Sequence, residues 1–390
     1  MSKTLQDYAT LINDTIQSNE INHYITTANM RQNLGGIDTF KNINIPQGKV
    51  RSFQKDDVLL SNIDPWHRQV YMAKQKGGCS SDVLVFRAKH IDSTTLFAIL
   101  SSQSFINYVC LGSIGSKRKR GDKVHMMNFK IPTINFTIAK IFNSIQNKIE
   151  NNHKINELLH KILELLYEQY FVRFDFLDEN NKPYQTSGGK MKFSKELNRL
   201  IPNDFEVKTL GELITWISGS QPPKSCHIYE HKEGYIRFIQ NRDYSSNDYI
   251  TYIPISKNNK ICYQYDIMID KYGEAGAVRF GLQGAYNVAL SKISVLNQSM
   301  QEYIRSYLNS KPIKKYLSNA CMASTRSSLN ENHIYSLMLP IPPINLLQKY
   351  EKIAKNIITA IIKNNQSTQT LTALRDFLLP LLLKQQVKPK

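Results

Sequence analysis

The chain has 390 residues, and Lys plus Arg outnumber Asp plus Glu by 50 to 32, which gives a formal net charge of +18 at pH 7. A hydrophobic fraction of 41% excludes a disordered basic tail, and the length allows two domains with cores of ordinary size. With aromatic residues at 10%, this charge favours a polyanionic partner over a basic protein with no nucleic-acid role.

Residues 1–133 show the short apolar strands and turns of a mixed globular domain. Strand-type runs cover residues 57–60 and 82–86. A helix-like segment at 96–109 leads into a loop at 112–121, which carries a run of lysines and arginines between glycines. We expect the first domain to end at residue 133.

The cysteines and the N-terminus bear on the cellular compartment. The five cysteines are scattered and form no CxxC or CxxH pair, which argues against zinc and fits buried thiols in a reducing cytoplasm. Residues 1–15 lack the apolar core of a signal peptide. The most apolar stretch, residues 374–383, is shorter than the about 20 residues that span a bilayer. We expect a cytoplasmic protein that is not inserted in a membrane.

A long helix is predicted for residues 134–176. Apolar residues recur there mostly at steps of three or four, which corresponds to one face of a helix. The run opens with Ile131-Pro132-Thr133-Ile134-Asn135, and proline is tolerated at the start of a helix. The pattern turns polar in its middle, at residues 151–154.

A polar connector and a second globular domain follow. Residues 177–205 contain a proline and a glycine pair, so we expect an exposed linker. Residues 206–341 repeat the order of the first domain, with strands at 235–239 and 266–270 and a helix-like segment at 300–317. This order predicts a duplicated domain.

A second long helix is predicted within residues 342–390. It opens with Ile341-Pro342-Pro343-Ile344-Asn345, which repeats the earlier phrase, and it keeps a near-heptad apolar seam. A helix of about forty residues measures ~60 Å, close to two turns of B-DNA at ~34 Å each. If the two helices pair antiparallel, the polar islands at 151–154 and 364–367 face each other and fix the register. The alternative is that the islands are solvated kinks or short loops.

The expected fold class is therefore α+β, with two similar domains joined by two long antiparallel helices in a pseudo-two-fold repeat. No catalytic, cofactor-binding or metal-binding residue is predicted. The sequence contains no GxxxxGK[ST] loop, no glycine-rich cofactor turn after a strand and no HExxH pair. Asp64-Pro65-Trp66 has a weak likeness to an amino-methyltransferase motif but lacks its second proline.

The remaining chemistry is binding. Loops carry Lys and Arg to phosphates, Arg also bonds guanine edges, and Asn or Gln can read adenine. A charge run is also typical of a solvated face, but the basic run at 117–120 occupies the place in its domain that Thr325-Arg326 occupies in the second. The candidate DNA-binding residues are Arg68, Lys117, Arg118, Lys119, Arg120, Ser220, Gln221, Asn241, Arg242, Lys271, Tyr272, Thr325 and Arg326.

Two of these candidate groups have a structural alternative. Trp66, His67 and Arg68 follow a strand and either enter a DNA groove or pack Trp66 into the core. The segment 240–242 either reads adenine or forms a plain polar turn.

The order of these motifs resembles the specificity (S) subunit of type I restriction-modification systems. The resemblance rests on the doubled helix openings, on Asp57-Val58-Leu59-Leu60 and on the domain opening Leu210-Gly211-Glu212 followed by Gly219-Ser220-Gln221-Pro222-Pro223. It extends over nearly the whole chain through the motifs Pro183-Tyr184, Ser187-Gly188-Gly189-Lys190, Gly273 to Gly276, and Leu374-Arg375-Asp376-Phe377-Leu378-Leu379-Pro380. The first domain departs from the pattern, because it lacks a Gly-Ser-x-Pro-Pro type of opening.

The resemblance implies a non-catalytic DNA-recognition subunit. Residues 1–133 and 206–341 would be target-recognition domains that each read one half of a split site. The helices at 134–176 and 342–390 would set the spacing and dock two methyltransferase (modification) subunits, through which restriction (translocase-nuclease) subunits join. S-adenosylmethionine, ATP and Mg are expected on those partners. The alternatives are a coiled-coil adaptor whose basic domains bind RNA or acidic proteins, and the specificity subunit of a type IIB-like enzyme.

Overall fold

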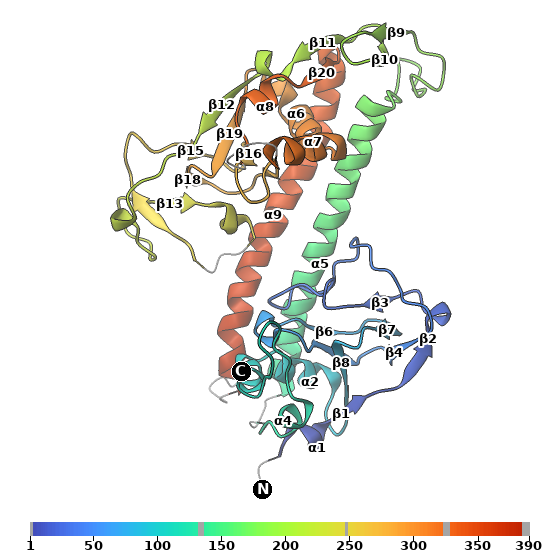
Figure 1. Ribbon diagram of the computed structural model, residues 1–390, viewed down its shortest axis with the longest axis vertical. Helices are drawn as coiled ribbons and strands as arrows, with labels where there is room; N and C mark the ends of the chain where they lie inside the picture. The colour runs from blue at the N-terminus through green and yellow to red at the C-terminus, as the bar shows by residue number, and fades with distance from the viewer. Residues whose placement is uncertain (1–2, 132–135, 246–248, 323–327, 384–390) are drawn as a thin grey trace. The chain divides into compact units, whose positions relative to one another are not determined.

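The computed structural model consists of two compact units (Figure 1). The structure describes residues 3–131, 136–245, 249–322 and 328–383. Unit 1 comprises residues 1–158 and 363–390, and unit 2 comprises residues 159–362. Both units mix helices and strands, which confirms the expected α+β class.

Unit 1 contains two four-stranded sheets. The first has the order β1-β8-β5-β6 and is antiparallel throughout. The second has the order β2-β4-β7-β3, with only β3 and β7 parallel. The strands are β1 Ala9–Ile12, β2 Thr15–Gln17, β3 Tyr24–Ile25, β4 Lys49–Phe53, β5 Val58–Ser61, β6 Val70–Met72, β7 Gly77–Cys79 and β8 Val83–Ala88.

The central strand β5 is buried on both faces, which explains its unbroken apolar sequence. Leu60 packs into the core shared with the helices, whereas Leu59 packs into a second core with Phe53 of the other sheet. The helical elements are α1 Leu5–Tyr8, η1 Ser18–Glu20, η2 Pro65–His67, α2 Ser93–Leu100, α3 Gln103–Leu111 and α4 Lys123–Met127. The strands predicted at 57–60 and 82–86 are confirmed as β5 and β8.

The single helix predicted at 96–109 is wrong, because two helices occupy this stretch. The first helix ends with Ser101 as its C-cap, and Ser102 caps the second, since its hydroxyl accepts a hydrogen bond from Phe105 N at 3.2 Å. The two helices are bent by 58° relative to each other. Among the described residues no single helix is long and apolar enough to cross a bilayer. The bent pair α2–α3 meets the length and composition criteria together, but most of its apolar side chains are buried in the unit 1 core.

Unit 2 has the same kinds of sheet. The orders are β12-β19-β16-β17 and β14-β13-β18-β15, and two strand pairs, β11–β20 and β9–β10, are added. The strands are β9 Met191–Ser194, β10 Arg199–Pro202, β11 Glu206–Thr209, β12 Ile214–Ser218, β13 Tyr235–Ile239, β14 Tyr252–Pro254, β15 Ile261–Cys262, β16 Ile267–Asp270, β17 Val278–Arg279, β18 Gly284–Tyr286, β19 Leu290–Val295 and β20 Met338–Ile341. The strands predicted at 235–239 and 266–270 are confirmed as β13 and β16.

The helix predicted at 300–317 is also divided. Its backbone is extended at Ser310, so that α6 ends there and α7 begins. The helical elements of unit 2 outside the long helices are η4 Leu210–Glu212, η5 Lys224–Cys226, η6 Asn241–Tyr244, η7 Gln298–Met300, α6 Gln301–Asn309, α7 Lys311–Met322 and α8 Asn332–Tyr335.

The two units contain the same capping box, in Thr4-Leu5-Gln6-Asp7 and in Thr209-Leu210-Gly211-Glu212. The carboxylate of Asp7 accepts from Thr4 N at 2.7 Å, and that of Glu212 accepts from Thr209 N at 2.7 Å. The first domain therefore shares this motif with the second, although its sequence lacks the Gly-Ser-x-Pro-Pro opening.

The central strands also begin alike. Asp57 precedes β5 and is ion-paired with Arg87 of β8 at 2.8 Å. Asp266 precedes β16 and is ion-paired with Lys292 of β19 at 3.3 Å. Each aspartate also accepts a hydrogen bond from the backbone NH three residues earlier.

The long helices are α5 Phe136–Tyr167, which continues as the π-helical turn η3 Glu168–Val172, and α9 Ile344–Leu383. The first predicted helix therefore ends before residue 176. α9 begins directly after Pro342 and Pro343, as expected, whereas residues 132–135 of the first helix opening lie outside the described residues.

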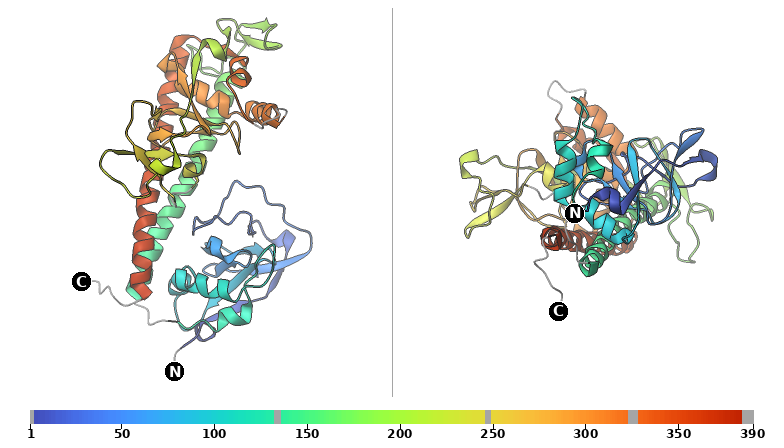
Figure 2. Two further views of the ribbon diagram at one scale, coloured as in Figure 1. Left: turned by 60° about the vertical axis from the view of Figure 1, so that its left-hand side comes forward. Right: turned by 90° about the horizontal axis from the view of Figure 1, so that it is seen from below.

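Within unit 1 the two long helices run antiparallel and side by side (Figure 2). Asn152 Nδ2 donates to the hydroxyls of Ser367 at 3.3 Å and Thr368 at 3.2 Å, and Asn156 bonds Asn365 one turn further on. The polar islands therefore contact each other inside continuous helices and form neither kinks nor loops. Within unit 2, Tyr170 of η3 lies 5.7 Å from Tyr350 of α9, measured between ring centroids.

The connector at 177–205 is more structured than the sequence predicts. Strands β9 and β10 pair as a hairpin within it. Phe205 is 1% exposed and packs edge-on against Phe174 at 5.5 Å. The segment is therefore anchored in unit 2 at its end and is not a free linker.

Candidate nucleic-acid interface

The basic run of unit 1 lies in a narrow hairpin. Ile114 and Arg120 exchange two backbone hydrogen bonds of 2.9 Å, and the residues between them are exposed. Gly115 has a φ of +125°, and a Cβ there would approach Arg118 O to 2.5 Å, so the turn requires glycine. Lys117, Arg118 and Lys119 are presented to solvent at the tip of the hairpin.

The fourth cation of the run is engaged. Arg120 forms an ion pair with Asp82 at 2.9 Å, although Arg120 is exposed and Asp82 is partly exposed. In the part of the chain that the structure describes, Lys117, Arg118 and Lys119 form no ion pair. The hairpin thus offers three free charges that are suited to phosphate contacts.

The hairpin is fastened to the loop 62–69, which joins β5 to β6. Asp64 N donates to Lys119 O at 2.8 Å, and Asp64 Oδ1 accepts from Lys119 N at 3.1 Å. The segment 30–36 contacts the same loop from elsewhere in the chain, since Asn33 N donates to His67 O at 2.8 Å and Leu34 N donates to Arg68 O at 3.0 Å. Three segments that are distant in sequence therefore meet in unit 1.

The side chain of Arg68 is largely buried and is held by contacts within unit 1. Its side chain is 12% exposed, donates to Ser101 O at 3.1 Å and lies 3.6 Å from the Asp376 carboxylate of α9. Burial lowers the pKa of Arg68, and the neighbouring Asp376 opposes that shift. These contacts favour an anchoring role for Arg68, whereas Trp66 is 47% exposed and does not pack in the core.

In unit 2, Ser220 and Gln221 lie beside the end of β18. Gly219 N donates to Leu290 O and Ser220 N donates to Tyr286 O, both at 3.1 Å. A Cβ on Gly219 would approach Asn287 O to 2.0 Å, so only glycine allows this close passage of two backbones. Ser220 is partly exposed and Gln221 is exposed.

The other candidates of unit 2 converge on the loop 271–277, which joins β16 to β17. Asn241 Nδ2 donates to Tyr272 O at 3.3 Å, and Leu329 N donates to Lys271 O at 3.0 Å. The exposed Arg242 guanidinium lies 5.8 Å from the ring centroid of Tyr249. The segment 240–242 is thus a capped turn that supports a neighbouring loop. Thr325 and Arg326 lie outside the described residues.

The two loop clusters are built alike. In unit 1 the loop after β5 is held by the segment 30–36, which follows β3, and by the basic hairpin, which follows α3. In unit 2 the loop after β16 is held by Asn241, which follows β13, and by Leu329, which follows α7. Sequence spacing predicted several members of these clusters but missed Asp64 and Asn33, whose hydrogen bonds join segments far apart in the chain.

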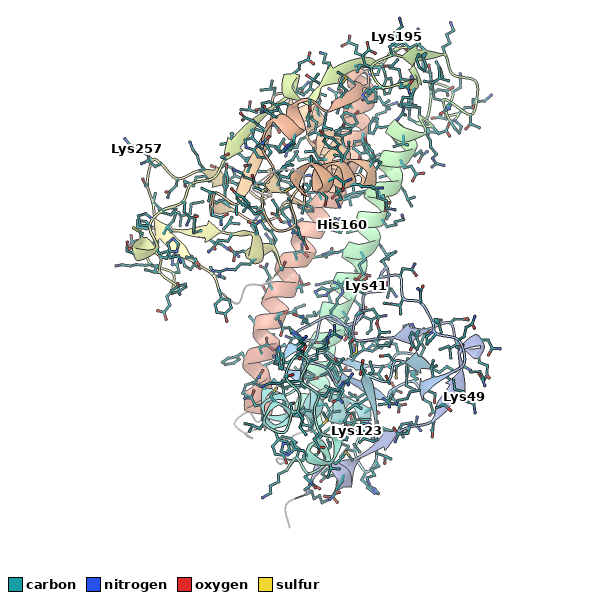
Figure 3. The ribbon with its side chains drawn as sticks, in the orientation of Figure 1. Lys41, Lys49, Lys123, His160, Lys195 and Lys257 are labelled. Atoms are coloured by element: carbon teal, nitrogen blue, oxygen red, sulfur yellow. The ribbon has the colours of Figure 1, made fainter. Side chains whose placement is uncertain are left out.

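Positive charge is not confined to these loops. Exposed lysines such as Lys49 and Lys123 of unit 1 and Lys195 and Lys257 of unit 2 spread over both surfaces (Figure 3). The described residues contain no group of three or more His, Cys, Asp or Glu side chains that could hold a metal ion. The chemistry presented at the loops is therefore that of amides, hydroxyls, cations and aromatic rings.

Residues 202–373 match the family described as type I restriction modification DNA specificity domain. The chain carries a type I DNA specificity domain. The matched region includes the two four-stranded sheets of unit 2, the loop cluster described above and most of α9. The predicted resemblance to specificity subunits is confirmed.

Two curated relatives of the specificity domain come from Methanocaldococcus jannaschii. The MjaIX specificity subunit of a type I restriction enzyme is 26% identical over 254 residues, which are 63% of this chain and 57% of that protein. The MjaVIII specificity subunit is 22% identical over 179 residues, which are 45% of this chain and 41% of that protein. The matches thus span about half the length of these curated relatives.

A solved structure extends the likeness in fold to the whole chain. The S subunit of a type I restriction-modification system from M. genitalium superposes with a TM-score of 0.62 at 15% identity, over 98% of this chain and 95% of that one. At this identity the likeness shows a shared fold, which includes the part of the chain outside the specificity domain match.

Proposed function

We propose that this chain is the DNA sequence-specificity subunit of a type I restriction-modification enzyme. Each unit contributes one target-recognition domain, and each domain reads one half of a bipartite DNA site. The chain itself carries out no methyl transfer and no cleavage. It selects the sequence on which partner subunits act.

The observation that carries this proposal is the specificity domain match in unit 2, together with the corresponding loop cluster in unit 1. In both units, loops with cations, amides and an exposed aromatic ring meet at the end of the central strand. Such loops suit a protein that positions itself on phosphates and reads base edges. The net charge of +18 adds a general attraction to DNA.

Helices α5 and α9 serve as the spacer between the half-sites and as the docking surface for two methyltransferase subunits. Restriction subunits join through these methyltransferases. The polar contacts between Asn152 and Ser367 and between Asn156 and Asn365 would fix the helix register and thereby the spacing. S-adenosylmethionine, ATP and Mg belong to the partner subunits in this scheme.

The test is selection of duplexes from a randomised pool by the purified full chain. We expect enrichment of a bipartite sequence whose two specified parts are separated by a fixed number of unspecified base pairs. Affinity for the enriched duplex should fall steeply with salt, because phosphate contacts release counterions. Enrichment of a single uninterrupted motif, or of no duplex, would contradict the proposal.

A further inference from the structure

The exposed indole of Trp66 lies at the tip of the 3₁₀ turn η2, in the loop that joins β5 to β6. Isolated apolar residues on a protein surface are common and need no function. Three further observations distinguish this one: the backbone that holds it, the charges beside it and its counterpart in unit 2.

The backbone around Trp66 is held in a costly conformation. Asp64 and Arg68, the residues that flank the turn, both have a φ of +49°, in the left-handed region that non-glycine residues rarely adopt. Such positions persist only where surrounding contacts enforce them, and they are common at functional sites.

Contacts from three directions enforce this conformation. Lys119 of the basic hairpin forms hydrogen bonds with Asp64, and backbone NH groups of the segment 30–36 donate to the carbonyls of His67 and Arg68. The Arg68 side chain donates a hydrogen bond to Ser101 O and forms an ion pair with Asp376. Since both ends of the turn are fixed, Trp66 is presented to solvent on a rigid support. A rigid aromatic side chain loses little conformational entropy when it binds.

The neighbouring charges select the ligand class. The paired bonds between Asp64 and Lys119 place the indole loop beside the hairpin that exposes Lys117 and Arg118. An apolar ring next to cations that form no ion pair within the described residues suits duplex DNA, because an apolar side chain can insert at a base step while the cations bind the flanking phosphates.

Unit 2 has an aromatic residue in the corresponding loop. Tyr272 is 45% exposed and lies between β16 and β17, as Trp66 lies between β5 and β6. Its carbonyl accepts from Asn241, and the adjacent Lys271 carbonyl accepts from Leu329 N. The Tyr272 loop is therefore supported from the same two places in its fold as the Trp66 loop.

We propose that Trp66 and Tyr272 are the base-contacting aromatic residues of the two recognition units, one for each half-site. Each ring lies against bases through its apolar face, while the neighbouring cations bind phosphate. This inference rests on the proposed function and adds to it that the aromatic rings contact bases and the cations contact phosphates.

The experiment uses the full chain and the duplex that the wild type enriches from a randomised pool. Trp66→Ala and Tyr272→Ala should each raise the Kd for this duplex by roughly 5- to 100-fold, the range measured when an aromatic–base contact is removed. The slope of log affinity against log salt should stay unchanged, because no phosphate contact is lost. Tyr229→Ala is the matched control, since it removes a ring that is 70% exposed elsewhere on unit 2, and it should leave the Kd unchanged.

Fluorescence gives a second readout that does not depend on a truncated side chain. The chain has two tryptophans, and Trp216 lies in β12, where its Nε1 donates to Ser218 Oγ at 3.1 Å. In Trp216→Phe, the emission of Trp66 should change on binding the enriched duplex, whereas Trp66→Phe should leave no DNA-dependent change in emission.

The outcomes separate the two proposals. If the wild type enriches a bipartite duplex but both alanine variants bind it with wild-type affinity and Trp66 emission does not respond, the aromatic contacts are disproved and DNA recognition stands. If the wild type enriches no duplex, both proposals fail. Loss of affinity with a shallower salt slope would assign these positions to phosphate contact and overturn the inference.

Discussion

Asn156 of α5 and Asn365 of α9 are joined by a side-chain hydrogen bond of 2.7 Å, in which Asn156 Nδ2 is the donor. Asn364 Nδ2 donates in turn to Asn156 Oδ1 at 2.9 Å, so both polar atoms of this amide are satisfied. Asn156 is only 8% exposed. A polar contact of this kind between two helices favours one register, because a shifted register would leave buried amide groups without partners.

Asn156→Ala should therefore lower the free energy of unfolding by about 1 kcal/mol, the usual net value of such hydrogen bonds. The matched control is Asn151→Ala, because Asn151 is exposed on the same helix, and it should change stability by less than about 0.5 kcal/mol. Urea unfolding of the three proteins gives the comparison. Equal stabilities would show that the amide contact does not hold the helices.

The aspartates that open the central strands should differ in their importance. Asp57 is 2% exposed and makes two hydrogen bonds of 2.8 Å with Arg87, whereas Asp266 is 26% exposed and makes one longer ion pair. Asp57→Ala should lower the unfolding free energy by about 2 kcal/mol, since it leaves Arg87 without its partner, and Asp266→Ala by about 1 kcal/mol or less. A larger effect for Asp266→Ala would contradict this ranking.

Glu351 should make unit 2 sensitive to pH. Burial raises the pKa of Glu351 to about 7, even though its carboxylate accepts a hydrogen bond from Glu302 N at 2.9 Å. Because the folded-state pKa lies above the ordinary value of 4.5, the unfolded state loses its proton first. The contribution of this group to stability is therefore greatest below about pH 4.5 and is lost as the pH rises to about 7.

Glu351→Gln keeps an acceptor for Glu302 N and removes the charge. At pH 8 this variant should be more stable than the wild type by an amount on the order of 1 kcal/mol, a value reduced from the full shift because Glu351 is partly exposed. At pH 4.5 the two proteins should differ little. Thermal unfolding across this range provides the measurement, and a constant difference between the two proteins would refute the assignment to Glu351.

The exposed cations of the basic hairpin should contribute salt-dependent DNA affinity. Replacing Lys117, Arg118 and Lys119 by alanine should weaken binding to mixed-sequence duplex and reduce the slope of log affinity against log salt by up to ~0.9 per lost phosphate contact. The control replaces Lys49, Lys55 and Lys76, which are exposed elsewhere on unit 1 and carry the same charge. If both triple variants change the slope equally, the hairpin acts only through net charge.

Local sequence patterns predicted the elements whose causes are local. The apolar run at Val58–Ser61 forms β5, and the prolines before Ile344 mark the start of α9. The polar islands of the helices were visible in the sequence as interruptions of the apolar seam, but the sequence left open whether they contact each other or form kinks or loops. In contrast, the split between α2 and α3 depends on the cap formed by Ser102, and the polar run at residues 101–104 did not by itself distinguish a cap from the exposed face of one helix.

The candidate site was harder to predict, because its geometry depends on distant partners. The sequence indicated that Arg68 follows a strand, but not that its guanidinium would lie beside Asp376 of α9. It also left open whether Trp66 is buried, which is decided by bonds from Lys119 and Asn33. Residue type and spacing thus identified the loops, whereas the role of each side chain depends on tertiary contacts.

The central claim is that the two units read two half-sites independently. The most direct measurement is methylation mapping of a host that carries this chain with its partner subunits, compared with a host in which residues 206–341 come from another specificity subunit. The account predicts that the half of the bipartite methylated site that unit 2 reads changes, whereas the half that unit 1 reads is retained. An unchanged site, or a site that differs in both halves, would contradict it.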